Sequence, residues 1–562
     1  MIGKNLDIAG PGPNNLAVSG NNSNRVFNIA GGAIVNLSGL TICNGHARDG
    51  AAGTNSVTPG WPGNDGGGIY NSGTLALTNC VITRCHSGQG GAGYSYSMFG
   101  QSPGCSSGGP GGNGGGIYNA GTLTLAACTL SYNTNGSGGS GGNAFLGIYP
   151  GGVGGNGGYG GGIYDAGIAT VIACTFGSNS AGAGGVGGYG GDGVVGQSGG
   201  AAGGWGGTGG AGGGLYSQGS PAFISCTFAG NTGGRGGQGG WGGSGSSPFS
   251  RGTVGDGGPG GDGGTGGSGG GLSCPGFFQS VACTFTANAA GGGGNGSRGG
   301  PGGMTFSIGS GGNGGNGGNG GNGGVGGGVS TWGSSTFQNV LAAQNSSAAG
   351  GLAGVGGAGG SGHPSGSSGY PGSSGLGGSG PDLFGAFTSN GHNLIGLDEG
   401  NYGFTDGVLG DRVGSGTPLN PLVGPLTNNG GPTFTCALLA GSPALDIGDD
   451  ALLDAPWNLA TDQRGLPRQS GSHVDIGAVE VQWASSPIRL VGCVRTTNGA
   501  IQMTLTNIPG ASLTVLAATN LASPLPTWTV LGPIPEIAPG QFEFVDPAPT
   551  NLPRRIYRVR CP

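Results

Sequence analysis

Charged side chains are scarce in this chain of 562 residues: Asp, Glu, Lys and Arg together make up 7%, and Lys4 is the single lysine. A formal net charge of −6 provides no positive field, so we predict no partnership with nucleic acid. No run of 18 or more apolar residues occurs, so we predict no membrane insertion by this chain. Residues 1–15 contain no charged-then-apolar export signal, and we expect that such a signal was lost upstream.

Sequence patterns of metal sites are missing too. No Cys-x-x-Cys pair occurs, the five histidines are scattered, and no segment matches the calcium loop of an EF-hand. One acidic group, Asp446, Asp449 and Asp450, could form a turn that binds calcium. The alternative is that these residues cap local backbone N–H groups. We predict no other cofactor.

Glycine, by contrast, is abundant. The chain contains 153 Gly and 33 Pro, a composition that would by itself indicate disorder. A repeat overrides that expectation, because residues 114–133, GGGIYNAGTLTLAACTLSYN, recur in recognisable form at five other places. The residue that follows the glycines, which we name the anchor, is in turn Ile69, Ile117, Ile163, Leu215, Leu272 and Val329.

Each repeat has the short strand-like pieces and fixed turn residues of one coil of a parallel β-helix, in which equivalent residues stack about 4.8 Å apart. A glycine stands four residues after every anchor, where we expect a turn conformation that other residues resist. Eleven residues after the anchor lies a ladder of buried thiols, which we interpret as packing rather than metal binding: Cys80, Cys128, Cys174, Cys226 and Cys283. Sixteen residues after it lies an asparagine ladder, expected at a second turn because Asn tolerates left-handed φ and can hydrogen-bond to its stacked neighbours: Asn133, Asn179, Asn231, Asn288 and Asn345. Phe176, Phe228 and Phe285 should stack inside the coils.

Between repeats lie inserts that start after the asparagine ladder and end at the next three glycines. Their sequences have a period of three, as in GGNGGNGGNGGNGGVGGG at 311–328. Three residues per turn is the period of the polyproline II helix, and glycine allows such helices to approach closely. We predict an ordered glycine-rich layer on one side of the solenoid, with disordered linkers as the alternative.

The chain changes character towards its C-terminus. Residues 397–486 lose the triplets and gain acidic residues, and from residue 487 apolar and polar residues alternate between turn signals. We therefore predict three parts: a parallel β-helix with inserts at 1–396, a segment at 397–486 that closes the solenoid, and a small antiparallel β-sandwich at 487–562. Cys493 and Cys561 bracket the sandwich and could form a disulfide. The fold class is all-β, with the β-helix right-handed.

Catalytic residues are hard to find on the repeats. Glycoside hydrolysis needs two facing carboxylates, and a lyase needs a base with a carboxylate cluster. The repeats proper contain one carboxylate, Asp165, and one cation, Arg84. We predict that the protein is not an enzyme and that it has no catalytic residues.

Aromatic residues are better candidates for binding. Tyr70, Tyr118, Tyr164 and Tyr216 follow the anchors and should point outward in a column. Together with insert residues they could stack on sugar rings, or the tyrosines could pack under the glycine layer; the insert aromatics are Tyr159, Tyr189, Trp205 and Trp241. Gly-Gly-X triplets also resemble those of snow-flea-type antifreeze proteins, which would imply ice binding, but the third positions here are a mixed set.

Two stretches resemble known families. GGGIY followed by Phe176-Gly-Ser-Asn179, and its equivalents, resembles the repeats of polymorphic outer-membrane proteins, which are bacterial surface adhesins of the pectin-lyase-like fold group. The blocks NGHNLIG (390–396), GPLTNNGGPTFTCALLAGSPALDIGD (424–449) and TDQRGLPR with DIGAVE (461–480) resemble a choice-of-anchor Q domain. These resemblances imply a secreted or cell-surface bacterial protein.

We therefore expect a non-enzymatic, exported structural or adhesive protein whose partners are surface glycans or other copies of itself. The first alternative is a β-helix that binds or degrades carbohydrate, and the second is ice binding through the Gly-Gly-X inserts.

Overall fold

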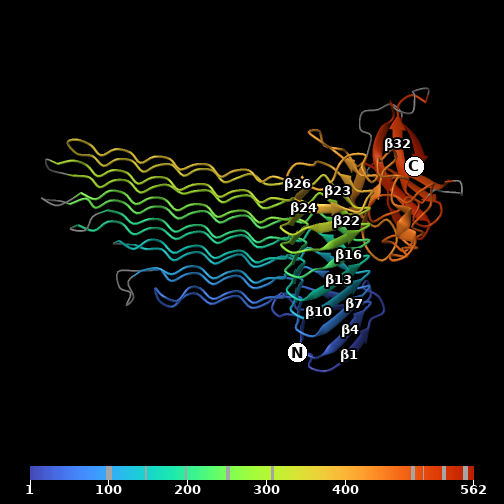
Figure 1. The fold of residues 1–562 in the computed structure, drawn as a ribbon, viewed down its shortest axis with the longest axis horizontal. Coiled ribbons are helices and arrows are strands. Elements are labelled where there is room, and N and C mark those ends of the chain that lie inside the picture. The colour runs from blue at the N-terminus through green and yellow to red at the C-terminus, as the bar shows by residue number, and fades with distance from the viewer. Residues whose placement is uncertain are drawn as a thin grey trace.

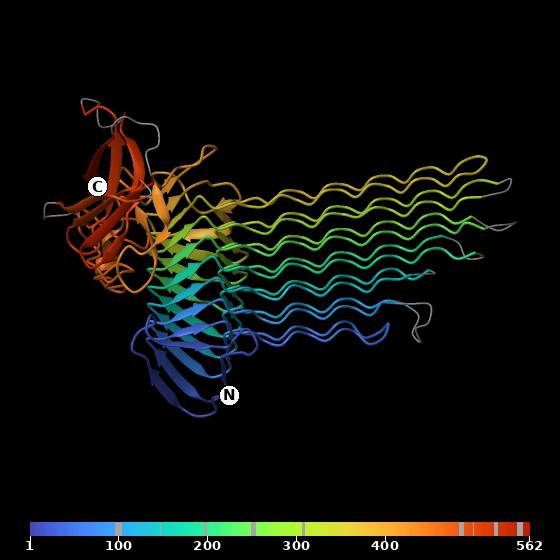
Figure 2. The same cartoon turned by 180° about the vertical axis from the view of Figure 1, so that it is seen from behind.

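The computed structural model describes residues 1–95, 104–145, 148–195, 199–248, 254–305, 309–482, 488–497, 499–521, 527–547 and 555–561. A parallel β-helix forms its centre, the inserts project from one side as long parallel arms, and the C-terminal region lies on the other side (Figures 1 and 2). The arms become longer towards the C-terminal end of the solenoid.

Each coil of the solenoid contributes one short strand to each of three faces. The first face contains the anchor strands β3 (Phe27–Ile29), β6 (Ile69–Asn71), β9 (Ile117–Asn119), β12 (Ile163–Asp165), β15 (Leu215–Ser217), β18 (Leu272–Cys274) and β21 (Val329–Thr331). The second contains β1 (Leu6–Ala9), β4 (Ile34–Ser38), β7 (Thr74–Thr78), β10 (Thr122–Ala126), β13 (Ile168–Ile172), β16 (Ala222–Ile224), β19 (Gln279–Val281) and β22 (Ser335–Gln338). The third contains β2 (Ala17–Ser19), β5 (Thr41–Cys43), β8 (Val81–Thr83), β11 (Thr129–Ser131), β14 (Thr175–Gly177), β17 (Thr227–Ala229), β20 (Thr284–Thr286) and β23 (Leu341–Ala343).

The last coils are irregular. Strand β24 (Leu383–Ser389) pairs with both β21 and β22, and so joins the first two faces into one sheet. Strands β25 (Leu394–Ile395), β26 (Asn401–Tyr402) and β27 (Arg412–Val413) end the solenoid. The pairing is parallel throughout, and equivalent residues are partners, as Ile117 is with Ile69 and Ile163. The predicted parallel β-helix is confirmed.

Side chains that alternate along each strand fill the interior of the coils. The anchors are fully buried, and so are Phe176, Phe228 and Phe285. The rings of Phe176 and Phe228 stack with centroids 4.4 Å apart, and those of Phe228 and Phe285 are 4.8 Å apart. The predicted phenylalanine column is therefore present in the core.

The glycine four residues after each anchor has a different role from the one predicted. None of these six glycines has positive φ. A Cβ at Gly121 would lie 2.0 Å from the Gly73 carbonyl oxygen, and one at Gly167 would lie 2.0 Å from that of Gly121. Close stacking of backbones, rather than a left-handed turn, therefore requires glycine here. The left-handed residue is instead the first of the three glycines before the anchor, such as Gly114 with φ of 62°.

The asparagine ladder also does not occupy the left-handed position. Positive φ occurs one residue earlier, at Tyr132 (54°), Ser178 (55°) and Gly230 (68°). That placement turns the chain so that the following asparagine side chain points into the solenoid, where Asn133, Asn179 and Asn231 are fully buried. Asparagine is thus required for its side chain and not for its tolerance of left-handed φ.

The inserts form a slab of two layers, which we name the glycine slab; it comprises the described residues of 46–66, 86–114, 134–160, 180–212, 232–269, 289–326 and 346–380. In each insert an outward segment runs from the solenoid and a return segment comes back. One glycine of each triplet donates to the neighbouring insert in the same layer, as Gly138 does to Ala183 at 2.8 Å. The next donates across to the other layer, as Gly139 does to Gly109 at 2.8 Å. This period-three network confirms the ordered layer.

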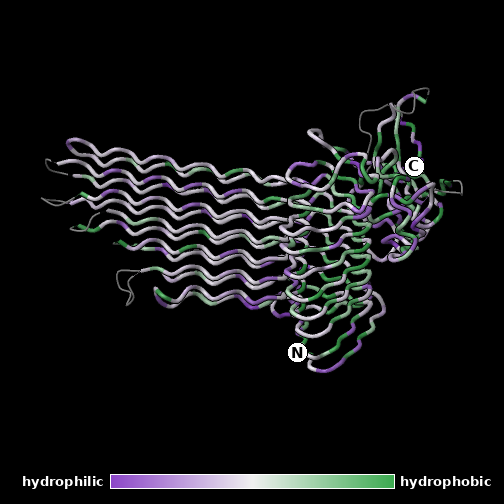
Figure 3. Tube along the Cα trace, in the orientation of Figure 1, coloured by the Kyte–Doolittle hydropathy of each residue, from purple (hydrophilic) through white to green (hydrophobic). Residues whose placement is uncertain are grey.

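The third residue of each triplet, which we name the X residue, faces outward. The backbone N–H of the X residue takes no part in this backbone network. In many triplets it donates instead to the side chain of an X residue in the preceding insert. The Asp262 side chain accepts from Asn319 N–H at 2.6 Å, and Asn319 Oδ1 accepts from Ser373 N–H at 2.9 Å. Figure 3 shows the resulting slab as mostly near-neutral in hydropathy, in contrast to the apolar stripes of the solenoid. Asn and Asp at X positions therefore lock adjacent inserts in register.

Residues 414–482 turn back along the third face of the solenoid. They contain the hairpin β28 (Val423–Thr427) and β29 (Thr435–Leu438) and the short 3-10 helix η1 (Asp450–Leu453). Gln463 is the main contact: its Oε1 accepts from Thr227 Oγ1 at 2.6 Å, and its Nε2 donates to Thr175 Oγ1 at 2.8 Å. Because this segment covers them, strands β14, β17, β20 and β23 are buried on both sides.

The C-terminal strands form two antiparallel sheets. One contains β30 (Arg489–Arg495), β31 (Ile501–Thr506), β34 (Glu536–Ala538) and β35 (Gln541–Asp546); the other contains β32 (Leu513–Ala518), β33 (Thr529–Ile534) and β36 (Ile556–Arg560). The predicted start of this part, residue 487, lies outside the described residues. The predicted Cys493–Cys561 disulfide is wrong. Cys493 carries a free, exposed thiol on β30, whereas Cys561 Sγ lies 3.4 Å from the Gln482 carbonyl oxygen, beyond the end of β36 in the other sheet.

Candidate functional site

The cysteine ladder lies inside the solenoid. Cys80, Cys128, Cys174, Cys226 and Cys283 are buried and unbridged. Two sulfur atoms accept from the backbone of the preceding coil: Cys174 Sγ lies 3.3 Å from Cys128 N, and Cys283 Sγ lies 3.3 Å from Cys226 N. Burial raises the pKa of the Cys226 thiol well above its usual range. The five thiols fill the core of the coils and contact backbone groups there, which supports a structural role.

The asparagine ladder is a continuous chain of side-chain hydrogen bonds. Nδ2 of Asn179 donates to Asn231 Oδ1 at 2.9 Å, and Asn231 repeats this contact with Asn288 at 2.9 Å. The same Oδ1 atoms accept backbone N–H groups, as Asn231 Oδ1 does from Asn179 at 3.0 Å. The ladder ends on Asp382, whose Oδ1 accepts from Asn345 Nδ2 at 2.9 Å. Every asparagine is thereby satisfied in the core and holds two coils together.

Sequence reasoning missed a second polar ladder, two residues after the anchors. It contains Asn71, Asn119, Asp165, Ser217, Cys274 and Thr331. The fully buried Asp165 accepts from Asn119 Nδ2 at 2.7 Å and from Ser217 Oγ at 2.8 Å. Its carboxylate is therefore occupied as one rung of the ladder and unavailable to a substrate. The signal was a small or polar residue at a fixed offset, hidden because its identity changes from rung to rung.

The prediction of calcium at Asp446, Asp449 and Asp450 is not supported. Among the described residues no group of three or more His, Cys, Asp or Glu side chains could hold a metal ion. Asp449 caps the short helix η1, with Oδ1 accepting from Ala451 N–H at 3.0 Å. Asp450 Oδ2 lies 2.7 Å from His473 Nδ1, and Asp446 Oδ1 accepts from Ser472 N–H at 2.9 Å. Asp446 and Asp450 thus bind residues 472–474, whereas Asp449 binds the start of η1 and also accepts from Gln338 Nε2 at 2.7 Å, so all three carboxylates are occupied by groups of this chain.

A buried charge network lies instead within the block TDQRGLPR…DIGAVE. Arg464 pairs with Asp462 at 2.8 Å and donates to the Gly510 carbonyl at 3.0 Å, which ties the segment to the β-sandwich. Glu480 accepts from Asp475 N–H at 2.8 Å, and its burial raises its pKa to about 8. Asp475 accepts from Val481 N–H at 2.6 Å. These side chains are buried and bind backbone groups, so the network stabilises the folded conformation of this segment.

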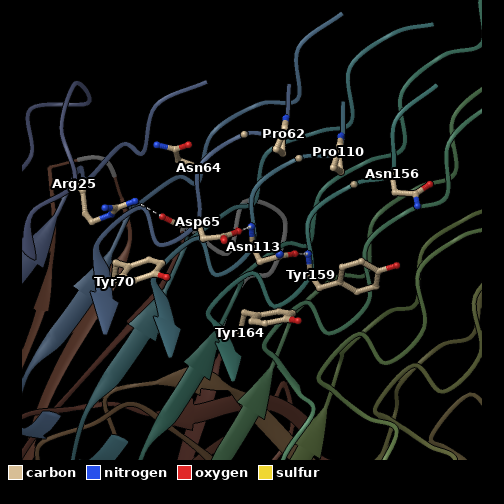
Figure 4. A pocket seen from close by; sticks show the side chains of 13 residues that line it. Arg25, Pro62, Asn64, Asp65, Tyr70, Pro110, Asn113, Asn156, Tyr159 and Tyr164 are labelled. Carbon is tan, nitrogen blue, oxygen red and sulfur yellow. Dashed lines mark hydrogen bonds between the residues drawn. The ribbon is translucent and has the colours of Figure 1, made fainter. Parts of the chain in front are cut away.

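The clearest surface pocket lies where the return face of the slab meets the first face of the solenoid. Its volume is about 520 Å³, and its lining includes Arg25, Asp65, Tyr70, Asn113, Tyr159 and Tyr164. Figure 4 shows Tyr70 and Tyr164 along one side, with Asp65, Asn113 and Tyr159 across from them. Residues from four successive coils and inserts therefore meet here.

Hydrogen bonds fix the polar groups of this pocket. Asp65 Oδ1 accepts from Asn113 N–H at 2.7 Å, and Asn113 Oδ1 accepts from Tyr159 N–H at 2.8 Å. Arg25 donates to the Asp65 carbonyl oxygen at 2.6 Å and lies over the Tyr70 ring, 5.1 Å from its centroid. Burial raises the pKa of Asp65 and lowers the pKa of Arg25. The pocket thus offers one carboxylate, one guanidinium and amide groups, and no second carboxylate lines it.

Two members of the tyrosine column, Tyr70 and Tyr164, line the pocket. Tyr70 and Tyr118 stack with centroids 4.9 Å apart, Tyr118 and Tyr164 are 5.1 Å apart, and Tyr164 and Tyr216 are 5.4 Å apart. The faces of the tyrosine rings are therefore covered by neighbouring tyrosine rings. The ring of Tyr159 is tilted against that of Tyr216, with centroids 5.0 Å apart. A sugar ring cannot stack on faces that are already covered, so this column offers edges and hydroxyl groups.

The insert aromatics lie on opposite faces of the slab. Tyr159 and Trp205 are X residues of return segments, whereas Tyr189 and Trp241 are X residues of adjacent outward segments. Tyr189 and Trp241 stand together, with centroids 5.5 Å apart. The sequence grouped these four residues as one set, and the structure separates them into two.

No family model and no curated protein matches the chain. One solved structure is similar, that of a springtail antifreeze protein from Granisotoma rainieri described as a bundle of nine polyproline type II helices whose crystal waters match the ice lattice. The match covers 42% of this chain and 92% of that chain, at 24% identity and a TM-score of 0.10. At these values it assigns neither a family nor a function.

Proposed function

We propose that this chain is a non-enzymatic, exported protein of the bacterial cell surface with a structural or adhesive role. The observation that carries the proposal is the glycine slab. Two glycine N–H groups of each triplet are bonded within it, and a Cβ at Gly139 or Gly185 would lie 2.0 Å or less from a carbonyl oxygen. The X side chains are what the slab presents to its surroundings. Because the glycine slab is ordered and projects from the solenoid, it can present these side chains to another surface.

The positions of the carboxylates support a role without catalysis. Hydrolysis of a glycosidic bond needs two carboxyl groups on either side of the bond. Asp165 is buried in a ladder, and Asp65 has no carboxylate partner among the residues that line its pocket. The described part of the chain also contains no helix with the length and apolar character needed to cross a bilayer.

We also propose the finer family assignment. The repeats would belong with those of polymorphic outer-membrane proteins in the pectin-lyase-like group, and residues 390–480 with choice-of-anchor Q domains. In support, the block at 390–396 forms the coil that contains β25, and the block at 461–480 supplies Gln463, Arg464 and the buried carboxylates that dock the segment. The proposed location is therefore outside the cell, and the partners are surface glycans or further copies of the chain.

Ice binding is the less supported alternative. A face that orders ice should be flat and uniform in small side chains. The outward face of the slab instead includes Tyr189, Arg235 and Trp241, and the return face includes Trp205 and Asp262. These bulky and charged X residues favour a partner with varied chemistry.

Two measurements on the full chain test the proposal. Beads coated with the purified protein should be retained on surfaces coated with polysaccharide or with the protein itself. The same protein should release no reducing ends and no unsaturated uronates from a panel of soluble polysaccharides. Release of product that is lost in Asp65→Asn would replace the proposal with a carbohydrate-degrading enzyme, and beads that bind no surface would remove the adhesive role.

A further inference from the structure

A second pocket lies on the outward face of the glycine slab, away from the solenoid. Its volume is about 460 Å³, and its lining includes Asn143, Phe145, Tyr189, Asp192, Trp241 and Arg298. Trp241 is 57% exposed and Tyr189 is 48% exposed, although their rings stack at an interplanar angle of 28°. Two large aromatic rings therefore stand side by side in solvent on this face of the slab.

The backbone network sets the order of the side chains. Asn143 Oδ1 accepts from Tyr189 N–H at 2.9 Å. Gly190 N–H donates to the Trp241 carbonyl at 2.9 Å, and Gly242 N–H donates to the Arg298 carbonyl at 3.0 Å. Four successive inserts therefore contribute one side chain each to a column, in the order amide, phenol, indole and guanidinium.

A neighbouring column adds a carboxylate. Asp192 is three residues after Tyr189, and its Oδ1 accepts from Ser244 N–H at 2.7 Å. Arg298 is exposed, and its guanidinium forms no hydrogen bond or ion pair with any described residue. The column of the aromatic pair thus continues into a donor, Arg298, and the neighbouring column supplies an acceptor, Asp192, of opposite charge. The backbone beneath them is already ordered, so a ligand would not have to order it.

We propose that this surface, Asn143, Tyr189, Trp241, Asp192 and Arg298, binds a hexopyranose unit of a neutral polysaccharide. The C–H face of the sugar would lie against the exposed part of the Trp241 indole, beside the exposed edge of the Tyr189 ring. Hydroxyl groups would donate to Asp192 and accept from Arg298 and the Asn143 amide. This inference rests on the proposed function as a binding protein and assigns its ligand class.

The opposite face of the slab supplies a matched control. Trp205 is an X residue of a return segment and is 62% exposed, close to the value for Trp241. Its carbonyl accepts from Gly154 N–H at 2.8 Å, the same kind of contact that positions Trp241. Its lateral neighbours are Val153 and Asp262, and it stacks on no aromatic ring among the described residues. Trp205→Ala therefore removes an indole of equal exposure without touching the aromatic pair.

Affinity electrophoresis of the full chain in gels that contain dextran, laminarin, galactomannan or hydroxyethylcellulose tests the inference. The protein should be retarded by at least one polysaccharide, and Trp241→Ala should weaken that binding about tenfold or more, the effect of truncating a central aromatic at a binding site. Tyr189→Ala should weaken it as well, and Trp205→Ala should leave it unchanged. Circular dichroism of each variant should match that of the original protein.

Three results would overturn the inference: no retardation in any gel, equal retardation of the original protein and Trp241→Ala, or equal losses in Trp241→Ala and Trp205→Ala. Bead retention on surfaces coated with the protein itself separates the two proposals. If that retention persists while every gel fails, the adhesive role stands with another copy as the partner, and the glycan site does not.

Discussion

Gly139 is buried within the glycine slab, and its replacement tests whether glycine is required there. A Cβ at this position would lie 1.9 Å from the Gly91 carbonyl oxygen and 2.5 Å from the Gly91 carbonyl carbon. Backbone atoms cannot rotate away as side chains do, so the outward segments must separate by about 1 Å or more. Gly139→Ala should therefore open the slab locally.

The expected loss follows from the contacts. Gly139 N–H donates to Gly109 at 2.8 Å, and its carbonyl accepts from Gly155 N–H at 2.8 Å. Loss of two hydrogen bonds costs about 1–3 kcal/mol, and overpacking costs about 1–3 kcal/mol. Lower entropy of the unfolded chain returns about 0.4–1 kcal/mol. The free energy of local opening should fall by about 2–4 kcal/mol, which is roughly a 30- to 1,000-fold rise in the open population.

Native-state proteolysis measures that population, because cleavage follows the open form when closing is fast. Subtilisin should cut Gly139→Ala between residues 134 and 144 at least thirty times faster than the original protein. Ser140→Ala is the control, since Ser140 is an exposed X residue of the same segment. Equal cleavage of Gly139→Ala and the original protein would refute the reasoning, as would equal acceleration by Ser140→Ala.

Three further predictions concern the solenoid and the C-terminal region. Asn231→Ala should lower the free energy of unfolding in urea by about 2–4 kcal/mol, because it leaves buried groups unpaired; a loss below about 1 kcal/mol would show that the ladder is dispensable. Burial raises the pKa of Glu480 to about 8 and of Asp475 to about 6, so the folded chain holds protons that the unfolded chain releases. The stability that these two groups contribute should be complete below their usual pKa values of 4.5 and 3.8, and should be lost as the pH rises to about 8. Glu480→Gln should therefore flatten the upper part of a plot of unfolding free energy against pH. An unchanged plot would argue against the buried carboxyl group. Iodoacetamide should alkylate Cys493 in the native protein and Cys226 only after unfolding, and rapid native labelling of Cys226 would contradict the closed core.

The solenoid could be predicted from the sequence because each coil repeats the same contacts. Each coil has one buried anchor position, so apolar residues recur at that position in the sequence. The same position makes Ile117 the partner of Ile69 in the structure. The period of three likewise revealed the inserts as separate from the coils. Local periodicity therefore determines both the β-helix and the slab.

Several roles could not be read in this way. The glycine four residues after the anchor was expected to adopt a special φ, yet at Gly121 the reason is the Gly73 carbonyl of the next coil. Such a contact exists only after the coils have stacked. The ladder through Asp165 was missed because residue types vary along it while the requirement for a small polar side chain does not.

Contacts between distant parts of the chain were the least predictable. Gln463 binds Thr175 and Thr227, which lie 288 and 236 residues away. Nothing in a single sequence shows that residues 414–482 fold back over the third face. The grouping of Tyr189 and Trp241 apart from Trp205 likewise depends on which layer each segment joins. The binding surface proposed above is therefore a consequence of the slab.

Residue-resolved amide hydrogen exchange through the inserts tests the ordered slab most directly. In 151–158 and 311–325, both glycine amides of each triplet should exchange slowly, because each donates to another segment. The amides of X residues without a side-chain acceptor, such as Val153, should exchange much faster, which gives protection a period of three. Fast exchange at every amide of these two stretches would contradict the slab and remove the basis for the binding surface on it.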